Sequence, residues 1–240
     1  MAATPDSPAV RLYTQGAEHF KKGAVDQAVE CFKKSAEADP NFYRAWAYLG
    51  MAYAQQGQLD PAIEAYRKCI DIAPTYHKAF NNVGELYRRK GLLDYASMVF
   101  KMATEIDDKI PHYFYNLGLT YNEIGMFPQS EAALRQAAKL DPDDYEYAVD
   151  LAQVQFTLKK FEDAASSLEV FHVAHPDHER APETKAKLTM LKRMAEQQKA
   201  AAKAMDSRST GIRRVSLEED ESNETKVVPQ GQDGPPPPAP

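Results

Sequence analysis

The stretch AWAYLGMAYAQQGQLDPAIEAY, residues 45–66, carries the clearest fold signal of this chain, and one of its residues is unfavourable for the helix that it predicts. Its first half has the apolar spacing of an amphipathic helix, yet Gly50 lies inside that helix. Glycine costs about 1 kcal/mol relative to alanine at such a position. We therefore expect a packing constraint at Gly50 that offsets this cost.

The residues of this stretch recur along the chain with a period of 34. Gly50 aligns with Gly84 and Gly118, and each is followed after three residues by a tyrosine and later by a turn glycine. The other aligned positions hold a bulky residue (Trp46, Phe80, Phe114), a small one (Ala28, Ala62, Ala96, Ser130, Ala164), a large one (Phe32, Tyr66, Phe100, Leu134, Leu168) and a proline (Pro40, Pro74, Pro142, Pro176). Such a period indicates a stacked array, because one unit cannot bury its own apolar face.

These residues closely resemble the signature of the tetratricopeptide repeat family. The resemblance implies five repeats, each of two antiparallel helices, stacked into an all-α right-handed solenoid. On this reading Gly50 is small because the first helix of its repeat approaches the second closely, with Ala62 as the matching small residue. The end repeats match less well, as expected where outer faces meet water. We place the repeats at 9–42, 43–76, 77–110, 111–144 and 145–178.

Three segments lie outside the repeats. We expect residues 1–8 to be a flexible N-terminus and residues 179–205 to form a basic helix that caps the fifth repeat. Residues 206–240 are rich in Ser, Glu, Gln and Pro, so we expect a disordered acidic and proline-rich tail. Within it, the run Arg-Arg-Val-Ser ending at Ser216 resembles the substrate motif of basophilic serine kinases, which makes Ser216 a candidate modification site.

Residues placed every 100° around the first helix of each repeat separate into two faces. Positions 4, 7, 8 and 11 carry the apolar signature and face the core. Positions 2, 5, 6, 9, 12 and 13 lie roughly opposite, and in the family this face lines a concave groove that holds an extended peptide or a partner helix. Its basic, amide and aromatic groups suit charge-assisted hydrogen bonds and stacking. The candidate groove residues are Arg44, Tyr48, Lys78, Asn81, Asn82, Arg88, His112, Tyr115, Asn116 and Asn122.

The groove residues also suggest a class of partner. The basic side chains of Arg44 and Lys78 at position 2 predict a protein or peptide partner with acidic groups. Asn82 and Asn116 at position 6 resemble a short version of the asparagine ladder of some superhelical family members, in which amides pair with a peptide backbone. Of the five positions that other members use to clamp a chaperone tail, only Lys78 carries the required residue.

The composition excludes several classes of function. A net charge of −6 gives no electrostatic case for binding nucleic acid. The apolar runs are too short for a transmembrane segment, and the N-terminus lacks the features of a secretory signal. The two cysteines lie in helical patterns, which favours a reduced, cytoplasmic protein.

The sequence also offers no constellation for chemistry. It contains no phosphate-binding loop and no nucleophile motif, so we expect neither an enzyme nor a cofactor. His172, His175 and His178 are spaced by three, but no further ligands complete a shell, so we expect no metal site.

These observations predict a non-catalytic adaptor that holds an extended peptide or a partner helix in the groove of repeats 2 to 4. One alternative stays open at this stage. In a self-assembling oligomeric scaffold, the loose end repeats would stack on neighbouring copies of the chain, which would make it a homo-oligomer.

Overall fold

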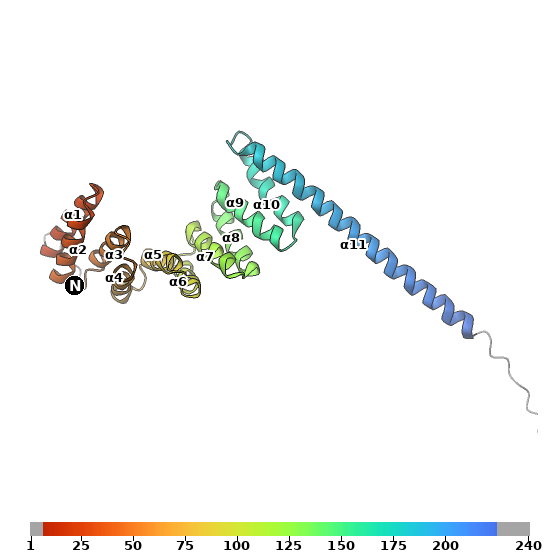
Figure 1. The fold of residues 1–240 in the computed structure, drawn as a ribbon, viewed down its shortest axis with the longest axis horizontal. Helices are drawn as coiled ribbons and strands as arrows, with labels where there is room; N and C mark the ends of the chain where they lie inside the picture. The colour runs from red at the N-terminus through yellow and green to blue at the C-terminus, as the bar shows by residue number, and fades with distance from the viewer. Residues whose placement is uncertain (1–6, 225–240) are drawn as a thin grey trace, which may run out of the picture. The chain divides into compact units, whose positions relative to one another are not determined.

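The computed structural model describes residues 7–224, with side chains as far as Met205. The described part consists of α-helices without a strand, which confirms the all-α prediction (Figure 1). The helices are α1 (Pro8–Lys21), α2 (Val25–Ala38), α3 (Tyr43–Gln55), α4 (Leu59–Ile72), α5 (His77–Arg89), α6 (Leu93–Ile106), α7 (Pro111–Ile124), α8 (Phe127–Leu140), α9 (Tyr145–Thr157), α10 (Phe161–Ala174) and α11 (Ala181–Glu224). None of these helices is both long enough and apolar enough to cross a membrane.

The first ten helices form five pairs that follow one another along the chain (Figure 1). Each odd-numbered helix from α1 to α9 packs against the helix that follows it, and each pair then packs on the next through its second helix. Residues up to Leu191 form one compact unit, and Lys192 begins a second unit. Because each repeat contacts chiefly its neighbours, the first unit is a one-dimensional stack of equivalent parts.

Gly50 marks the point where α3 meets α4. A Cβ atom on Gly50 would lie 2.8 Å from Cδ2 of Tyr66, a ring that is almost wholly buried. The same approach recurs in the other three of the first four pairs, where a Cβ on Gly16 or Gly84 would lie 2.7 Å from the ring of Phe32 or Phe100 and a Cβ on Gly118 would lie 2.6 Å from Leu134. The close contact expected at Gly50 is therefore present, and the side chain that fills the space is that of Tyr66, while Ala62 is buried on the same helix.

The fifth repeat replaces the usual tyrosine of the first helix with Gln155, which is 0% exposed. Gln155 donates a hydrogen bond to Oε1 of Glu131 at 3.4 Å and accepts one from the Ser167 hydroxyl at 2.8 Å. Glu131 is 7% exposed at its side chain and also binds Lys160 and Arg135, each at 2.6 Å. The irregular residues of the fifth repeat thus form a polar network that ties it to the fourth.

The beginning of α11 covers the fifth repeat. Leu188 and Leu191 are buried in a cluster with Ala152, Ala164 and Leu168 of α9 and α10. This contact removes the apolar side of the last helix pair from water, as terminal repeats require.

The same helix extends further than the sequence analysis expected. We placed its end near residue 205 because the composition changes at Asp206, but α11 continues to Glu224. The segment 206–224 contains no proline and includes arginine and glutamate, which favour helix, although Gly211 costs about 1 kcal/mol. Ser216 lies in this part of α11. The remainder of the expected tail, 225–240, and residues 1–6 lie outside the described residues.

We expect Gly50→Ala to lower the free energy of unfolding by about 1 kcal/mol. Overpacking a core costs about 1–3 kcal/mol, and alanine returns only about 1 kcal/mol through its better helix propensity. Gln55→Ala, at an exposed position of the same helix, should stay within about 0.5 kcal/mol of the wild type. Urea unfolding followed by circular dichroism measures both, and a stabilised Gly50→Ala would contradict the packing role of this glycine.

We expect Glu131→Gln to destabilise the protein in a pH-dependent way. Burial acts to raise the pKa of Glu131, but hydrogen bonds from Lys160, Arg135 and Gln155 outweigh it and hold the pKa below its usual value. A carboxylate with a depressed folded-state pKa stabilises above its unfolded-state pKa and loses that contribution as the pH falls through the folded-state value. The cost of the substitution should be about 1–2 kcal/mol at neutral pH, because the partners are half exposed.

Unfolding measured at a series of pH values checks this expectation. The difference between wild type and Glu131→Gln should shrink as the pH falls from the unfolded-state pKa of glutamate, about 4.3, through the lower folded-state pKa of Glu131, where the wild-type side chain also becomes neutral. Glu64→Gln, the same change at an exposed carboxylate of α4, provides the control and should show little difference at any pH. A constant difference for Glu131→Gln would contradict the electrostatic role of this network.

Candidate interaction surface

The ten predicted groove residues lie on the first helices of repeats 2, 3 and 4. We call the surface formed by positions 2, 5, 6, 9, 12 and 13 of the first helices the first-helix face. α3 contributes Arg44 and Tyr48, α5 contributes Lys78, Asn81, Asn82 and Arg88, and α7 contributes His112, Tyr115, Asn116 and Asn122.

Neighbouring repeats are linked across this face by side-chain pairs that join position 5 of one repeat to position 6 of the next. We call these pairs rungs. Their members lie 35 residues apart in the sequence, so a rung joins two first helices directly. The rungs are Tyr13 with Tyr48 (ring centroids 5.0 Å apart), Asn81 with Asn116 (3.0 Å) and Tyr115 with Asp150 (2.8 Å).

The rung between repeats 2 and 3 is replaced by a different bond. Position 5 of repeat 2 is Ala47, which is buried and offers no polar side-chain atom. Asn82, at position 6 of repeat 3, instead donates its amide to the hydroxyl of Tyr66 at 3.0 Å. Because Tyr66 is also the ring that packs on Gly50, the closure of repeat 2 positions the side chain of Asn82.

The structure does not join Asn82 and Asn116 into one ladder for a ligand. Asn116 is 5% exposed, and its amide nitrogen lies 3.0 Å from Oδ1 of Asn81 and 3.1 Å from Nε2 of His112. Both asparagines therefore have partners inside the protein. An amide buried to this extent stabilises the stack of repeats and offers little surface to a peptide.

Position 2 of the face carries an exposed polar side chain in each of repeats 2 to 4. Arg44, Lys78 and His112 occupy this position on α3, α5 and α7, and all three are exposed. Lys78 makes no ion pair with any residue between 7 and 205, whereas Arg88 is held by Glu123 at 3.0 Å and also by Glu85. Arg44 and Lys78 are therefore accessible cations of this face in repeats 2 and 3, together with Arg89 at position 13 of repeat 3.

An apolar hollow at the fifth repeat extends the first-helix face beyond the residues that the sequence predicted. It has a volume of about 110 Å³ and lies between α9 and the beginning of α11. Val149, Gln153 and Phe156, at positions 5, 9 and 12, line it together with Lys187 and Met190. The sequence signal for this hollow was that Val149 and Phe156 are apolar at positions 5 and 12, which are polar in repeat 3.

A row of aromatic side chains at the beginnings of the repeats was also missed. The rings of Tyr43 and Tyr76 lie 5.1 Å apart, and those of His77 and Tyr113 lie 5.6 Å apart. Nδ1 of His77 is 2.6 Å from the hydroxyl of Tyr113, and Nε2 is 3.7 Å from Asp107. Burial, with a further contribution from Asp107, raises the pKa of Tyr113 to about 12. These contacts join the beginnings of neighbouring repeats, so the side chains of this row already pack against one another within the protein.

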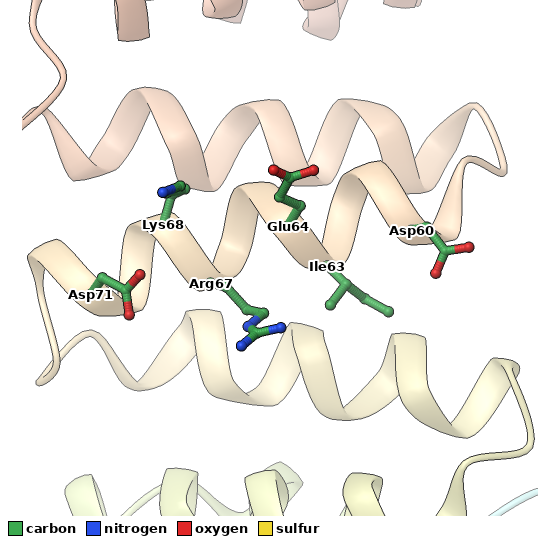
Figure 2. Close-up of a pocket in the computed structure, with 6 residues that line it drawn as sticks. All are labelled: Asp60, Ile63, Glu64, Arg67, Lys68 and Asp71. Atoms are coloured by element: carbon green, nitrogen blue, oxygen red, sulfur yellow. The ribbon is translucent and has the colours of Figure 1, made fainter.

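A second hollow, of about 460 Å³, lies along α4 and holds none of the predicted residues (Figure 2). Asp60, Glu64, Arg67 and Lys68 are among its lining residues, and all of them come from one helix. Figure 2 shows Glu64 and Lys68 pointing to one side of α4 and Arg67 to the other, so the charged groups do not converge on a common point. This hollow therefore lacks the arrangement of a ligand site.

The three histidines near the end of the repeats have other contacts. Nε2 of His175 lies 2.9 Å from Asp143, and the ring of His178 stacks on Tyr145 with centroids 5.3 Å apart. Nδ1 of His172 is buried without a hydrogen-bond partner among the described residues. In that part of the chain, no three side chains of His, Cys, Asp or Glu are grouped to hold a metal ion.

Sequence models of the tetratricopeptide repeat match residues 11–42, 43–76 and 115–178. No curated protein matches the sequence. Similar solved structures include MamA, with 19% identity, a TM-score of 0.66 and coverage of 72% of this chain and 96% of that one. PilF of Pseudomonas aeruginosa has 18% identity and a TM-score of 0.60, and covers 82% of this chain and 98% of its own.

A third similar structure is YrrB, described as a tetratricopeptide repeat protein with an unusual peptide-binding site. It has 16% identity and a TM-score of 0.62, and the match covers 74% of this chain and 92% of YrrB. At such identities the likeness concerns the fold alone. The matched segments, the five helix pairs and the glycine that closes each of the first four show that this chain belongs to the tetratricopeptide repeat family.

Proposed function

We propose that this protein is a non-catalytic, cytoplasmic adaptor that binds an extended acidic segment of a partner protein on the first-helix face of repeats 2 to 4. The observation that carries the proposal is the row of exposed side chains at position 2. Arg44, Lys78 and His112 recur at the same position of three successive first helices. The cationic side chains of Arg44 and Lys78, one on each of two neighbouring first helices, suit charge-assisted hydrogen bonds to the carboxylates of an extended chain.

The rungs support this proposal by fixing the face before a partner arrives. Asn81, Asn116 and Tyr115 are already bonded to neighbouring repeats, so their side chains need little further ordering on binding. A preorganised surface loses less conformational entropy when its partner docks. The rung residues therefore hold the spacing of the helices, while the position-2 row makes the contacts.

The class of ligand has support from a structural relative. YrrB, whose fold is similar, is described as having a peptide-binding site. We infer a peptide or an unfolded protein segment as the ligand class for this chain too. We also propose that phosphorylation of Ser216 regulates the adaptor, since a phosphate adds about −1.5 to −2 charges to the helix that carries it.

The test reverses charge on two different faces of the stack. We expect Arg44→Glu combined with Lys78→Glu to reduce capture of proteins from native lysate by about tenfold or more at low salt, because steering and ion pairing are both reversed. Arg67→Glu combined with Lys68→Glu applies the same change in charge to exposed positions of α4 and should leave capture unchanged. Quantitative mass spectrometry of the captured proteins gives the measurement.

Circular dichroism should first show that both double variants are as helical as the wild type. Asn116 is left intact in this design, because removing a buried amide would weaken the fold and confuse the result. Equal loss of partners from both double variants would indicate a nonspecific charge effect. Equal retention by both would show that the first-helix face is not the binding surface.

A further inference from the structure

The second helix of repeat 3 exposes an apolar stripe that the proposed function does not use. Tyr95, Met98 and Met102 on α6 are 56%, 55% and 43% exposed. Their spacing of three and then four residues places them on one side of the helix. The opposite side of α6, with Ala96 and Phe100, is buried against the neighbouring helices. Exposed apolar patches of this kind mark interaction surfaces more often than single exposed residues do.

The repeat architecture does not require this stripe. Mostly polar or charged residues hold the same three positions in the other repeats, namely Gln27, Glu30 and Lys34, then Pro61, Glu64 and Lys68, then Gln129, Ala132 and Gln136, and finally Asp163, Ser166 and Val170. α6 packs chiefly against α5 and α7, which take its buried side. The stripe is therefore a property of repeat 3 alone, and a binding partner would explain why it is apolar.

We propose that α6 is a dimerisation surface that packs antiparallel against α6 of a second copy of this chain. The spacing of Tyr95, Met98 and Met102 is that of positions a, d and a in a heptad seam. In an antiparallel pair, Tyr95 of one copy faces Met98 of the other. Met102 then faces the turn at Gly91, where a Cβ atom would meet nothing within 4 Å and the methionine finds room.

The charges beside the stripe are what select a second copy as the partner. Asp94 and Lys101 each precede an a position, so both are at position g. Antiparallel pairing of this seam sets Asp94 of one copy opposite Lys101 of the other, and the twofold axis repeats the pair. Parallel pairing would not bring these two residues together. The face is thus complementary to itself in charge as well as in its apolar residues.

Lys101 is available for this exchange of partners. Its ammonium lies 3.8 Å from Glu105 on the same helix, and both side chains are more than 60% exposed. Such exposed pairs contribute little stability, so Lys101 can turn toward a second copy at small cost. A single-helix contact buries less than the roughly 800 Å² per partner of a typical stable interface, so we expect a reversible dimer with a dissociation constant in the micromolar range.

Sedimentation equilibrium of the full chain, over a roughly hundredfold range of concentration around this constant, tests the dimer. We expect a monomer–dimer equilibrium for the wild type. Met98→Glu should raise the dissociation constant at least about tenfold, because a charge would be buried without a partner. Ala132→Glu places the same charge at the matching exposed position of repeat 4 and should leave the constant unchanged.

A charge exchange tests the antiparallel arrangement. Asp94→Lys and Lys101→Asp should each weaken self-association, because like charges then face each other across the twofold axis. An equimolar mixture of these two variants should associate more tightly than either alone, because every cross pair in the mixed dimer has opposite signs. Circular dichroism should show all variants to be as helical as the wild type.

Three results would overturn the proposal. Monomers at every concentration would mean that the stripe does not pair with a second copy. A dimer that Met98→Glu leaves intact would place the interface elsewhere, for example at the end repeats. A mixture no tighter than its components would exclude the antiparallel pairing. None of these results bears on the first-helix face, so the adaptor proposal would stand or fall separately.

Discussion

Each of the first four helix pairs closes where a glycine of the first helix receives a large side chain from the second. A Cβ atom on Gly50, Gly84 or Gly118 would lie within 3.0 Å of Tyr66, Phe100 or Leu134 respectively. The close approach gives the large residue a buried position and offsets the poor helix propensity of glycine. The first four helix pairs therefore close through the same kind of contact.

The same contact reaches the candidate interaction surface. Tyr66 fills the space that Gly50 leaves, and its hydroxyl accepts the amide of Asn82 on the next repeat. Between other neighbouring repeats, the rungs link the two first helices directly, as between Asn81 and Asn116. Packing inside a pair and hydrogen bonding between pairs are therefore parts of one arrangement. As a result, the side-chain amides of Asn81, Asn82 and Asn116 are hydrogen-bonded within the protein and are less available to a ligand.

Repeat 3 carries two surfaces with different chemistry. Its first helix presents Lys78 among the exposed cations, while its second helix presents Tyr95, Met98 and Met102. A repeat protein can place separate functions on its first and second helices because each repeat needs only its neighbours for stability. An adaptor that also pairs with itself would present two copies of the binding face, which raises the apparent affinity for a partner that carries two binding segments.

The helix pairs could be predicted from the amino-acid sequence alone, because the 34-residue period and the glycine in the first helix of each of the first four pairs repeat the same local requirement. The sequence also located the first-helix face, since that face follows from helical geometry alone. It could not separate Asn116 from Lys78. Both are polar residues on one side of a helix, but Asn116 is buried by partners on α5 and α7 and Lys78 is exposed.

The roles of two other sets of residues depend on how the helices pack and could not be predicted from the sequence. In the sequence, Gln155 is only a departure from the tyrosine of the repeat signature. In the structure it donates a hydrogen bond to Glu131, which lies 24 residues earlier in the chain. Tyr95, Met98 and Met102 have the spacing of a core stripe, and periodicity cannot tell which side of a helix its neighbours will cover. That choice depends on where α5 and α7 pack, and they bury Ala96 and Phe100 and leave the stripe in water.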